Sequence, residues 1–303
     1  MYRLVLFILA FLLLVSASLA RDVVLSKERF SHLHSEGDLT CTQLNEMCHG
    51  LSGSAVSDMV IEHMDRLSDF SWGGINGLVR RNTMDRLAIY YAVKHAVETR
   101  DPRDMTLEQI LAATNGMRDS ERCDMALVFM PRMASRHLGF TSLKQLARRC
   151  GGQGMYRRRI LEAGLKLLNR RCYYLFEIVP LAQVISCRTH MLEFLKECLP
   201  KISGLDIEVV RIIAKEMRFA GSHDYEALHF IEAGLKHLDY PKMTTREYLR
   251  LASTMHKSAK VAFIEGNLKI VNDLNEENVQ KLVESVSGDS NQTKVREAAV
   301  ALM

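Results

Sequence analysis

The residues that could form an active site lack the spacing that known catalytic motifs require. Gly50–Ser54 has serine where the last glycine of a nucleophile elbow would stand. Gly151–Gly154 follows no predicted strand, which indicates a turn and not a phosphate-binding loop. His223–His229 lacks the histidine spacing of a zinc protease, and His32 with His34 supply too few ligands for a metal ion. We therefore expect a protein that is not an enzyme and carries no metal or other cofactor.

One segment is rich in groups that bind anions. Nine Lys or Arg residues and a single acid, Glu162, lie between Thr141 and Leu175, a net charge of +8 in a chain whose overall charge is +4. Guanidinium groups bind phosphate oxygens bidentately, and tyrosine rings offer faces on which bases stack. The basic candidates are Lys144, Arg148, Arg149, Arg157, Arg158, Arg159, Lys166, Arg170 and Arg171, and the stacking candidates are Tyr156, Tyr173 and Tyr174.

This charge pattern leaves three interpretations open. It predicts single-stranded or ribosomal RNA as the partner, or an acidic protein surface, while a solvated helix face is the non-functional alternative. In either functional case the chain is expected to belong to a larger assembly.

The elements that position these residues are predicted to be helices. Good helix formers dominate the sequence, and there are only five prolines. Capping patterns begin helices near Thr106, Thr244 and Asn275, while Pro131 and Pro180 should kink a helix or shift its boundary. Apolar residues with the spacing of one helix face recur about every 34 residues, around Leu44, Ile75, Ile110, Leu146, Leu181, Val210, Leu249 and Val279.

A repeated segment supports the same period. Glu162–Lys166 recurs unchanged as Glu232–Lys236, and Glu265–Lys269 is a looser copy. Because a single pair of helices cannot bury its apolar face, neighbouring pairs must stack. The predicted fold is all-α: an α-solenoid, in a right-handed superhelix, of about eight helix–turn–helix repeats of about 34 residues.

The chain is expected to have three parts: residues 1–20, a polar lead-in over 21–38, and the helical-repeat domain over 39–303. Arg3 precedes an apolar run from Leu4 to Ala20, which favours a cleavable signal peptide, with an uncleaved anchor as the alternative. A membrane becomes a partner only if this leader is not cleaved. Asn291 is a glycosylation site only if the chain is secreted. The seven cysteines are irregularly spaced, as buried apolar residues would be.

The repeats resemble a known class. Phe140–Ala147 and Met105–Ala112 each have a polar opening followed by Gln, an aliphatic residue and Ala. In this they resemble the octotricopeptide and heptatricopeptide-like repeats of organellar RNA-binding proteins in protists and algae. The resemblance spans residues 39–303 and implies RNA processing or ribosome assembly, without catalysis, in a mitochondrion or plastid.

Two functional hypotheses follow. The first is a non-catalytic scaffold that binds RNA, or an RNA–protein assembly, through its basic fourth repeat. The alternative is a protein–protein interaction scaffold of the secretory pathway. The leader indicates entry to that pathway, which is also a route to a secondary plastid, whereas the repeats indicate a mitochondrion as the alternative compartment.

Overall fold

The computed structural model describes residues 38–133, 135–152, 154–216 and 225–303. The leader, residues 21–37 of the lead-in, His32, His34 and His223 lie outside the described residues. Within them the fold is all-helical, as expected, with sixteen α-helices and isolated β-bridges in place of strands. No helix of the described part combines the length and apolar character that a membrane span requires.

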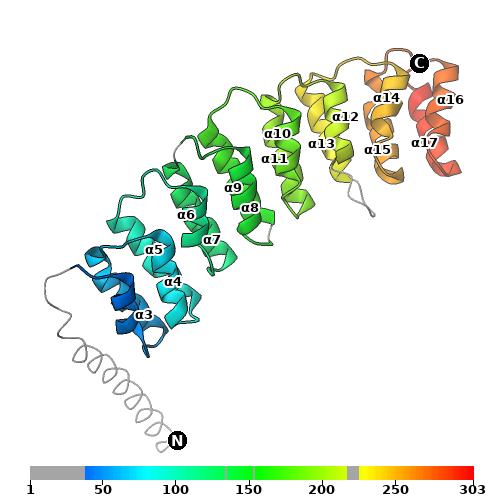
Figure 1. Ribbon diagram of the computed structural model, residues 1–303. Coiled ribbons are helices and arrows are strands. Elements are labelled where there is room, and N and C mark those ends of the chain that lie inside the picture. The colour runs from blue at the N-terminus through cyan, green and yellow to red at the C-terminus, as the bar shows by residue number, and fades with distance from the viewer. Residues whose placement is uncertain (1–37, 134, 153, 217–224) are drawn as a thin grey trace, which may run out of the picture. The chain divides into compact units, whose positions relative to one another are not determined.

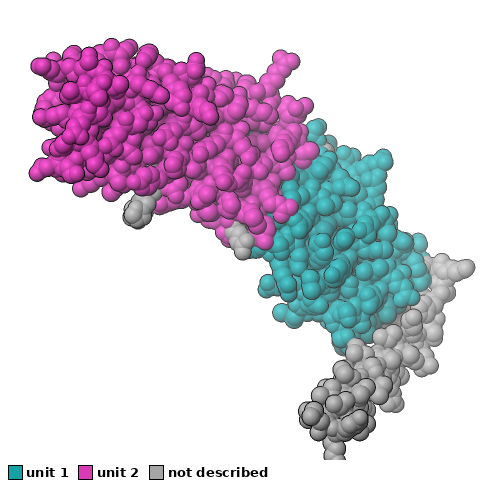
Figure 2. All heavy atoms as spheres, turned by 180° about the vertical axis from the view of Figure 1, so that it is seen from behind, with its two compact units in different colours: residues 1–142 teal, residues 143–303 magenta. Residues whose placement is uncertain are grey.

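The chain divides into two compact units, Met1–Ser142 and Leu143–Met303 (Figure 2). The first contains α2 (Cys41–Cys48), α3 (Gly53–His63), α4 (Trp72–Asn82), α5 (Arg86–Thr99), α6 (Leu107–Ala113) and α7 (Asp119–Phe129). Helix α8 (Phe140–Arg149) begins just before the second unit. That unit continues with α9 (Gly154–Leu168), α10 (Leu175–Ala182), α11 (Arg188–Cys198), α12 (Ile207–Glu216), α13 (Tyr225–His237), α14 (Thr245–Ala252), α15 (Lys257–Asn267), α16 (Glu276–Glu284) and α17 (Asp289–Val300).

Each unit has two layers of helices. In the second unit, α10, α12, α14 and α16 contact one another in sequence, and α9, α11, α13, α15 and α17 do the same in the other layer (Figure 1). The predicted apolar positions are buried between the layers, except Leu249, which is half-buried. Its neighbour Tyr248 is fully buried instead, because its hydroxyl can donate to Phe263 O at 3.0 Å inside the core.

Most predicted helix boundaries are confirmed. Thr106, Thr244 and Asn275 are N-caps whose side chains accept a backbone hydrogen bond. Pro131 lies in a short 3-10 helix directly after α7 ends, and Pro180 lies in the second half of α10. Pro131 is tolerated because it lies in the first turn of its helix, where the missing N–H has no helical partner, whereas Pro180 lacks the N–H that would bond back within α10.

The helix pairs are of two alternating kinds, which the sequence period did not reveal. Pairs that begin with α2, α6, α10 and α14 have a first helix of 7 or 8 residues, a second of 11, and then a 3-10 helix of 3 residues. A parallel β-bridge closes each of these bridged pairs: Leu39–Leu67, Met105–Met133, Tyr173–Ile202 and Met243–Val271. The described residues show no such bridge in the intervening pairs, whose second helices have 12 to 15 residues.

This alternation explains the repeated segment. Glu162–Lys166 lies on α9 and Glu232–Lys236 on α13, both second helices of unbridged pairs, with one bridged pair between them. Gly164 packs against Leu143 of α8, and Gly234 packs against Val210 of α12. The glycines are needed because they let two helices approach closely. Gly266, in the looser copy, is exposed on a bridged pair and has no such contact.

The two glycine environments predict opposite effects of the same substitution. A Cβ atom at Gly234 would lie 2.7 Å from Val210 Cγ2, so Gly234→Ala should lower the free energy of unfolding by about 1–3 kcal/mol through overpacking. A Cβ atom at Gly266 meets nothing within 4 Å, so Gly266→Ala should raise it by up to about 1 kcal/mol through helix propensity. Denaturant unfolding of the two variants measures both; a neutral or stabilising Gly234→Ala would contradict the close approach.

Candidate functional site: an aromatic and basic surface on the second unit

The predicted basic residues lie on α8, on α9 and in the connection from α9 to α10. Their side chains differ in what they contact. Lys144, Arg157 and Arg158 are half-buried, whereas Arg148, Arg149, Arg159, Lys166, Arg170 and Arg171 are exposed. The set is therefore not a single patch of solvent-facing charge.

Arg157 is occupied by the fold, which corrects its assignment as a binding residue. Its Nε donates to Gly151 O at 2.6 Å and its Nη1 to Val184 O at 2.7 Å. The side chain thus joins the α8–α9 turn to the residues that follow α10. Because these bonds use two sides of the guanidinium group, Arg157 has a structural role.

Arg158 is also removed from the binding set. It forms ion pairs with Glu162 on its own helix and with two acids of α11, Glu193 and Glu197, the last at 2.9 Å. The sequence window counted Glu162 alone and missed the carboxylates that α11 brings to α9. Packing therefore neutralises Arg158, which the count along the chain treats as a free positive charge.

Tyr173 cannot stack on a ligand. Only 1% of it is exposed, and its hydroxyl donates to Leu165 O at 2.9 Å, so it belongs to the core. Tyr156 is half-buried. Tyr174 differs, because half of it is exposed and its ring is stacked on Phe176 with centroids 5.4 Å apart.

Phe176 was missed by sequence reasoning. It is 73% exposed, although a phenylalanine in an apolar helical pattern normally faces the core. The signal that could have found it is a comparison of the four bridged pairs. The position of Phe176 is taken by Thr42, Glu108 and Arg246 in the other three pairs, all polar and exposed.

Tyr174 departs from the same pattern. The corresponding residues Thr40, Thr106 and Thr244 cap their helices with the side-chain hydroxyl. Tyr174 makes no side-chain cap bond, and only its backbone N–H donates, to Glu177 at 2.9 Å. Two residues at this helix start, Tyr174 and Phe176, therefore lack a capping side chain and expose an aromatic ring, which is typical of residues kept for binding.

Five residues of this stretch are exposed, and we group them under the name aromatic–basic surface: Lys166, Arg170, Arg171, Tyr174 and Phe176. Arg170 Nη1 lies 2.9 Å from Glu177 Oε1, and half of the arginine side chain is exposed. The guanidinium and ammonium groups can bind phosphate oxygens, and the outer face of the Tyr174–Phe176 stack can receive a planar ring. Nothing in this surface pairs a nucleophile with a base.

The glycosylation candidate lies elsewhere. Asn291 is in the first turn of α17, and its Nδ2 donates to Ser287 O at 3.0 Å. Thr293 of the same sequon donates its hydroxyl hydrogen to Asp289 O. Within the described residues no cluster of three or more His, Cys, Asp or Glu is placed to hold a metal ion.

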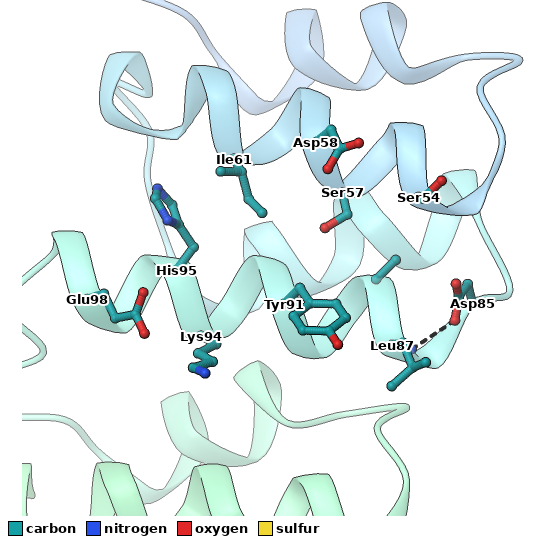
Figure 3. A pocket seen from close by; sticks show the side chains of 11 residues that line it. Ser54, Ser57, Asp58, Ile61, Asp85, Leu87, Tyr91, Lys94, His95 and Glu98 are labelled. Carbon is teal, nitrogen blue, oxygen red and sulfur yellow. Dashed lines mark hydrogen bonds between the residues drawn. The ribbon is translucent and has the colours of Figure 1, made fainter. Parts of the chain in front are cut away.

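A groove on the first unit is the other candidate. It lies between α3 and α5 and has a volume of about 520 Å³. Figure 3 shows Asp58 on one wall, with Tyr91 facing it from the other and Lys94, His95 and Glu98 towards one end. The charges are of both signs and the groove is open, so it suits a polar segment of another chain better than a nucleic acid.

Comparison with known proteins adds no family. No protein-family model matches the chain, and no curated protein matches it. One solved structure that is similar comes from work on the computational design of self-assembling cyclic protein homo-oligomers. It is 14% identical over 94% of this chain and 95% of its own, with a TM-score of 0.14. At that score the likeness carries no information on fold or function.

The missing cap at Tyr174 has a measurable cost. Tyr174→Thr restores the cap found in the other bridged pairs and should raise the free energy of unfolding by about 1 kcal/mol, which corresponds to roughly 2–4 °C in Tm. The reverse change, Thr244→Tyr, is the matched control and should destabilise by a similar amount. Thermal unfolding compares the two, and a Tyr174→Thr chain less stable than the parent would show that the tyrosine serves the fold.

Proposed function

We propose that this chain is a non-catalytic scaffold that binds single-stranded RNA, alone or within an RNA–protein assembly, through the aromatic–basic surface. We also propose that the chain contains about eight helix–turn–helix repeats in a right-handed superhelix. The arrangement of the helices in pairs and in two layers supports this. The resemblance of the repeats favours a role in RNA processing or ribosome assembly in an organelle.

The observation that carries the proposal is the exposed Tyr174–Phe176 stack beside Arg170 and Arg171. Phe176 leaves an aromatic ring 73% exposed at a position that is polar in the other bridged pairs, and Tyr174 replaces a capping threonine. Bases stack on such rings whatever their identity, and nearby arginines neutralise the phosphates. Single-stranded RNA presents both groups at once, whereas a duplex hides the faces of its bases.

The salt dependence of the affinity should show how many basic side chains contact RNA phosphates. Neutralising each phosphate of a single strand contributes about −0.7 to the slope of log K against log salt. With Lys166, Arg170 and Arg171 engaged, the affinity of the purified chain for fluorescent oligouridine should fall steeply as salt rises. Undetectable or salt-independent binding would contradict the proposal.

Substitution of Phe176 separates base stacking from general apolar contact. Phe176→Ala should weaken oligouridine binding by about 1–3 kcal/mol, or roughly 5- to 150-fold in Kd. Phe176→Leu keeps the apolar surface but removes the ring, and should lose nearly as much. Fluorescence anisotropy measures both variants. Phe176→Thr, which copies Thr42, is a third variant expected to fold well and bind weakly.

The reactivity of Cys172 gives an independent test of whether RNA covers the same surface. It is exposed, whereas the other six cysteines are buried or half-buried. Burial raises the pKa of the Cys48 and Cys198 thiols to about 12, so alkylation of the folded chain should select Cys172. Bound oligouridine should slow that reaction; an unchanged rate would place the RNA elsewhere.

The second candidate is a protein-interaction scaffold of the secretory pathway, which the groove between α3 and α5 favours. It predicts that the purified chain does not bind oligouridine and that Phe176→Leu leaves binding of its protein partner unchanged. Oligouridine binding with a steep salt slope would count against it.

A further inference from the structure

A second exposed aromatic ring lies just before the next bridged pair, at the position equivalent to Arg170. Tyr240, 39% exposed, is in the connection from α13 to α14, as Arg170 is in the connection from α9 to α10. Each connection follows a copy of the repeated segment, which ends in Lys166 or Lys236. Figure 1 shows the connections into α10 and α14 along the same, upper edge of the second unit.

The backbone at Tyr240 is unfavourable for a tyrosine. Asp239 has a φ of 56° and Tyr240 a φ of 47°, so two successive non-glycine residues are left-handed. Asn169 has the same left-handed conformation at the position equivalent to Asp239, with a φ of 46°. Tyr240 adds a second such residue, and its backbone N–H donates to Leu235 O at 2.8 Å. A backbone that holds an aromatic ring outward at a conformational cost indicates a use for the ring.

One cation lies against this ring, and other basic residues are near it in the chain. Lys269 Nζ lies 5.5 Å from the centre of the Tyr240 ring, and Lys242 Nζ donates to Lys269 O at 2.6 Å. Lys236 and Arg246 are exposed nearby in the chain. The place therefore repeats the composition of the aromatic–basic surface, an exposed ring among basic side chains.

Two acids of this pair, Glu247 and Asp273, are bound to helix starts, whereas Asp239, next to Tyr240 in the chain, is exposed. Glu247 accepts hydrogen bonds from the backbone N–H and the hydroxyl of Thr244, which lower its pKa. Asp273 accepts from the hydroxyl and backbone N–H of Thr245, which lower its pKa too. Their charge is directed at the helix N-termini, where the dipole favours it.

A further cation lies between the two rings along the chain. Lys201 is exposed at the end of a 3-10 helix, and its carbonyl accepts from Tyr173 N–H at 2.7 Å, directly before Tyr174. The β-bridge thus places Lys201 beside the start of α10. Positive groups therefore occur beside the first ring, beside the second and between them in sequence.

We propose that Tyr240, with Lys236, Arg246 and Lys269, forms a second nucleotide subsite, and that one RNA strand follows this edge from Phe176 to Tyr240. Equivalent positions of stacked repeats form one continuous surface. Packed helices lie 8–10 Å apart, so two steps from one bridged pair to the next span about 20 Å. This inference rests on the proposed function. It adds that each bridged pair of the second unit contributes one nucleotide subsite.

The length of the RNA provides the test. Oligouridines of about 4 and about 16 nucleotides cover the range of site sizes of single-strand-binding domains. Tyr240→Ala should weaken binding of the longer strand by about 10-fold, because the second contact is intramolecular, and should change binding of the shorter strand less than about 2-fold. Tyr240→Phe keeps the ring and should retain the parent affinity.

The matched control is Tyr225→Ala. Tyr225 is 43% exposed and begins α13, at the opposite end of the helix that Tyr240 follows. It should leave the affinity for both strands unchanged. If Tyr240→Ala and Tyr225→Ala behave alike while Phe176→Ala still weakens binding, the second subsite is wrong and the proposed function stands. If the parent chain binds neither strand, both are wrong.

Discussion

The structure depends on the backbone bridge that closes every bridged pair. In the pair of α10 and α11, Tyr173 N–H donates to Lys201 O and Ser203 N–H donates to Tyr173 O, at 2.7 and 2.8 Å. The same two bonds occur at Leu39, where Leu39 N–H donates to Arg66 O at 2.8 Å. These bonds fix where the first helix begins. Because they join backbone atoms, the side chains beside them are free to vary, and this freedom allows Tyr174 and Phe176 to replace a cap and a polar residue.

Much of the helical architecture was readable from the sequence, and the reason is local. Apolar spacing marks buried faces, and Thr106, Thr244 and Asn275 mark helix starts, because burial and capping act through the side chains that the sequence displays. The alternation of bridged and unbridged pairs was not readable. The bridge is made by backbone atoms, and its four first residues, Leu39, Met105, Tyr173 and Met243, share only a large buried side chain, which many other positions in the chain also have.

The candidate site was predicted only in part, for a similar reason. A count along the chain includes Arg158 as a positive charge but omits Glu193 and Glu197, which only packing brings to it. Tyr173 and Tyr174 are neighbours of the same type, yet one is in the core and the other at the surface, because successive residues at a helix start face different ways. Comparing equivalent positions of the repeats within the chain does reveal residues that depart from the common pattern. Phe176 is the clearest case.

The alternation of the helix pairs has a consequence for how such a chain changes length. A bridge recurs only after two pairs, since equivalent bridge positions are 66 to 70 residues apart. Duplication or loss of a single pair would join two pairs of the same kind, an arrangement that does not occur among the described residues. We therefore expect gene duplication to keep the alternation only in steps of four helices.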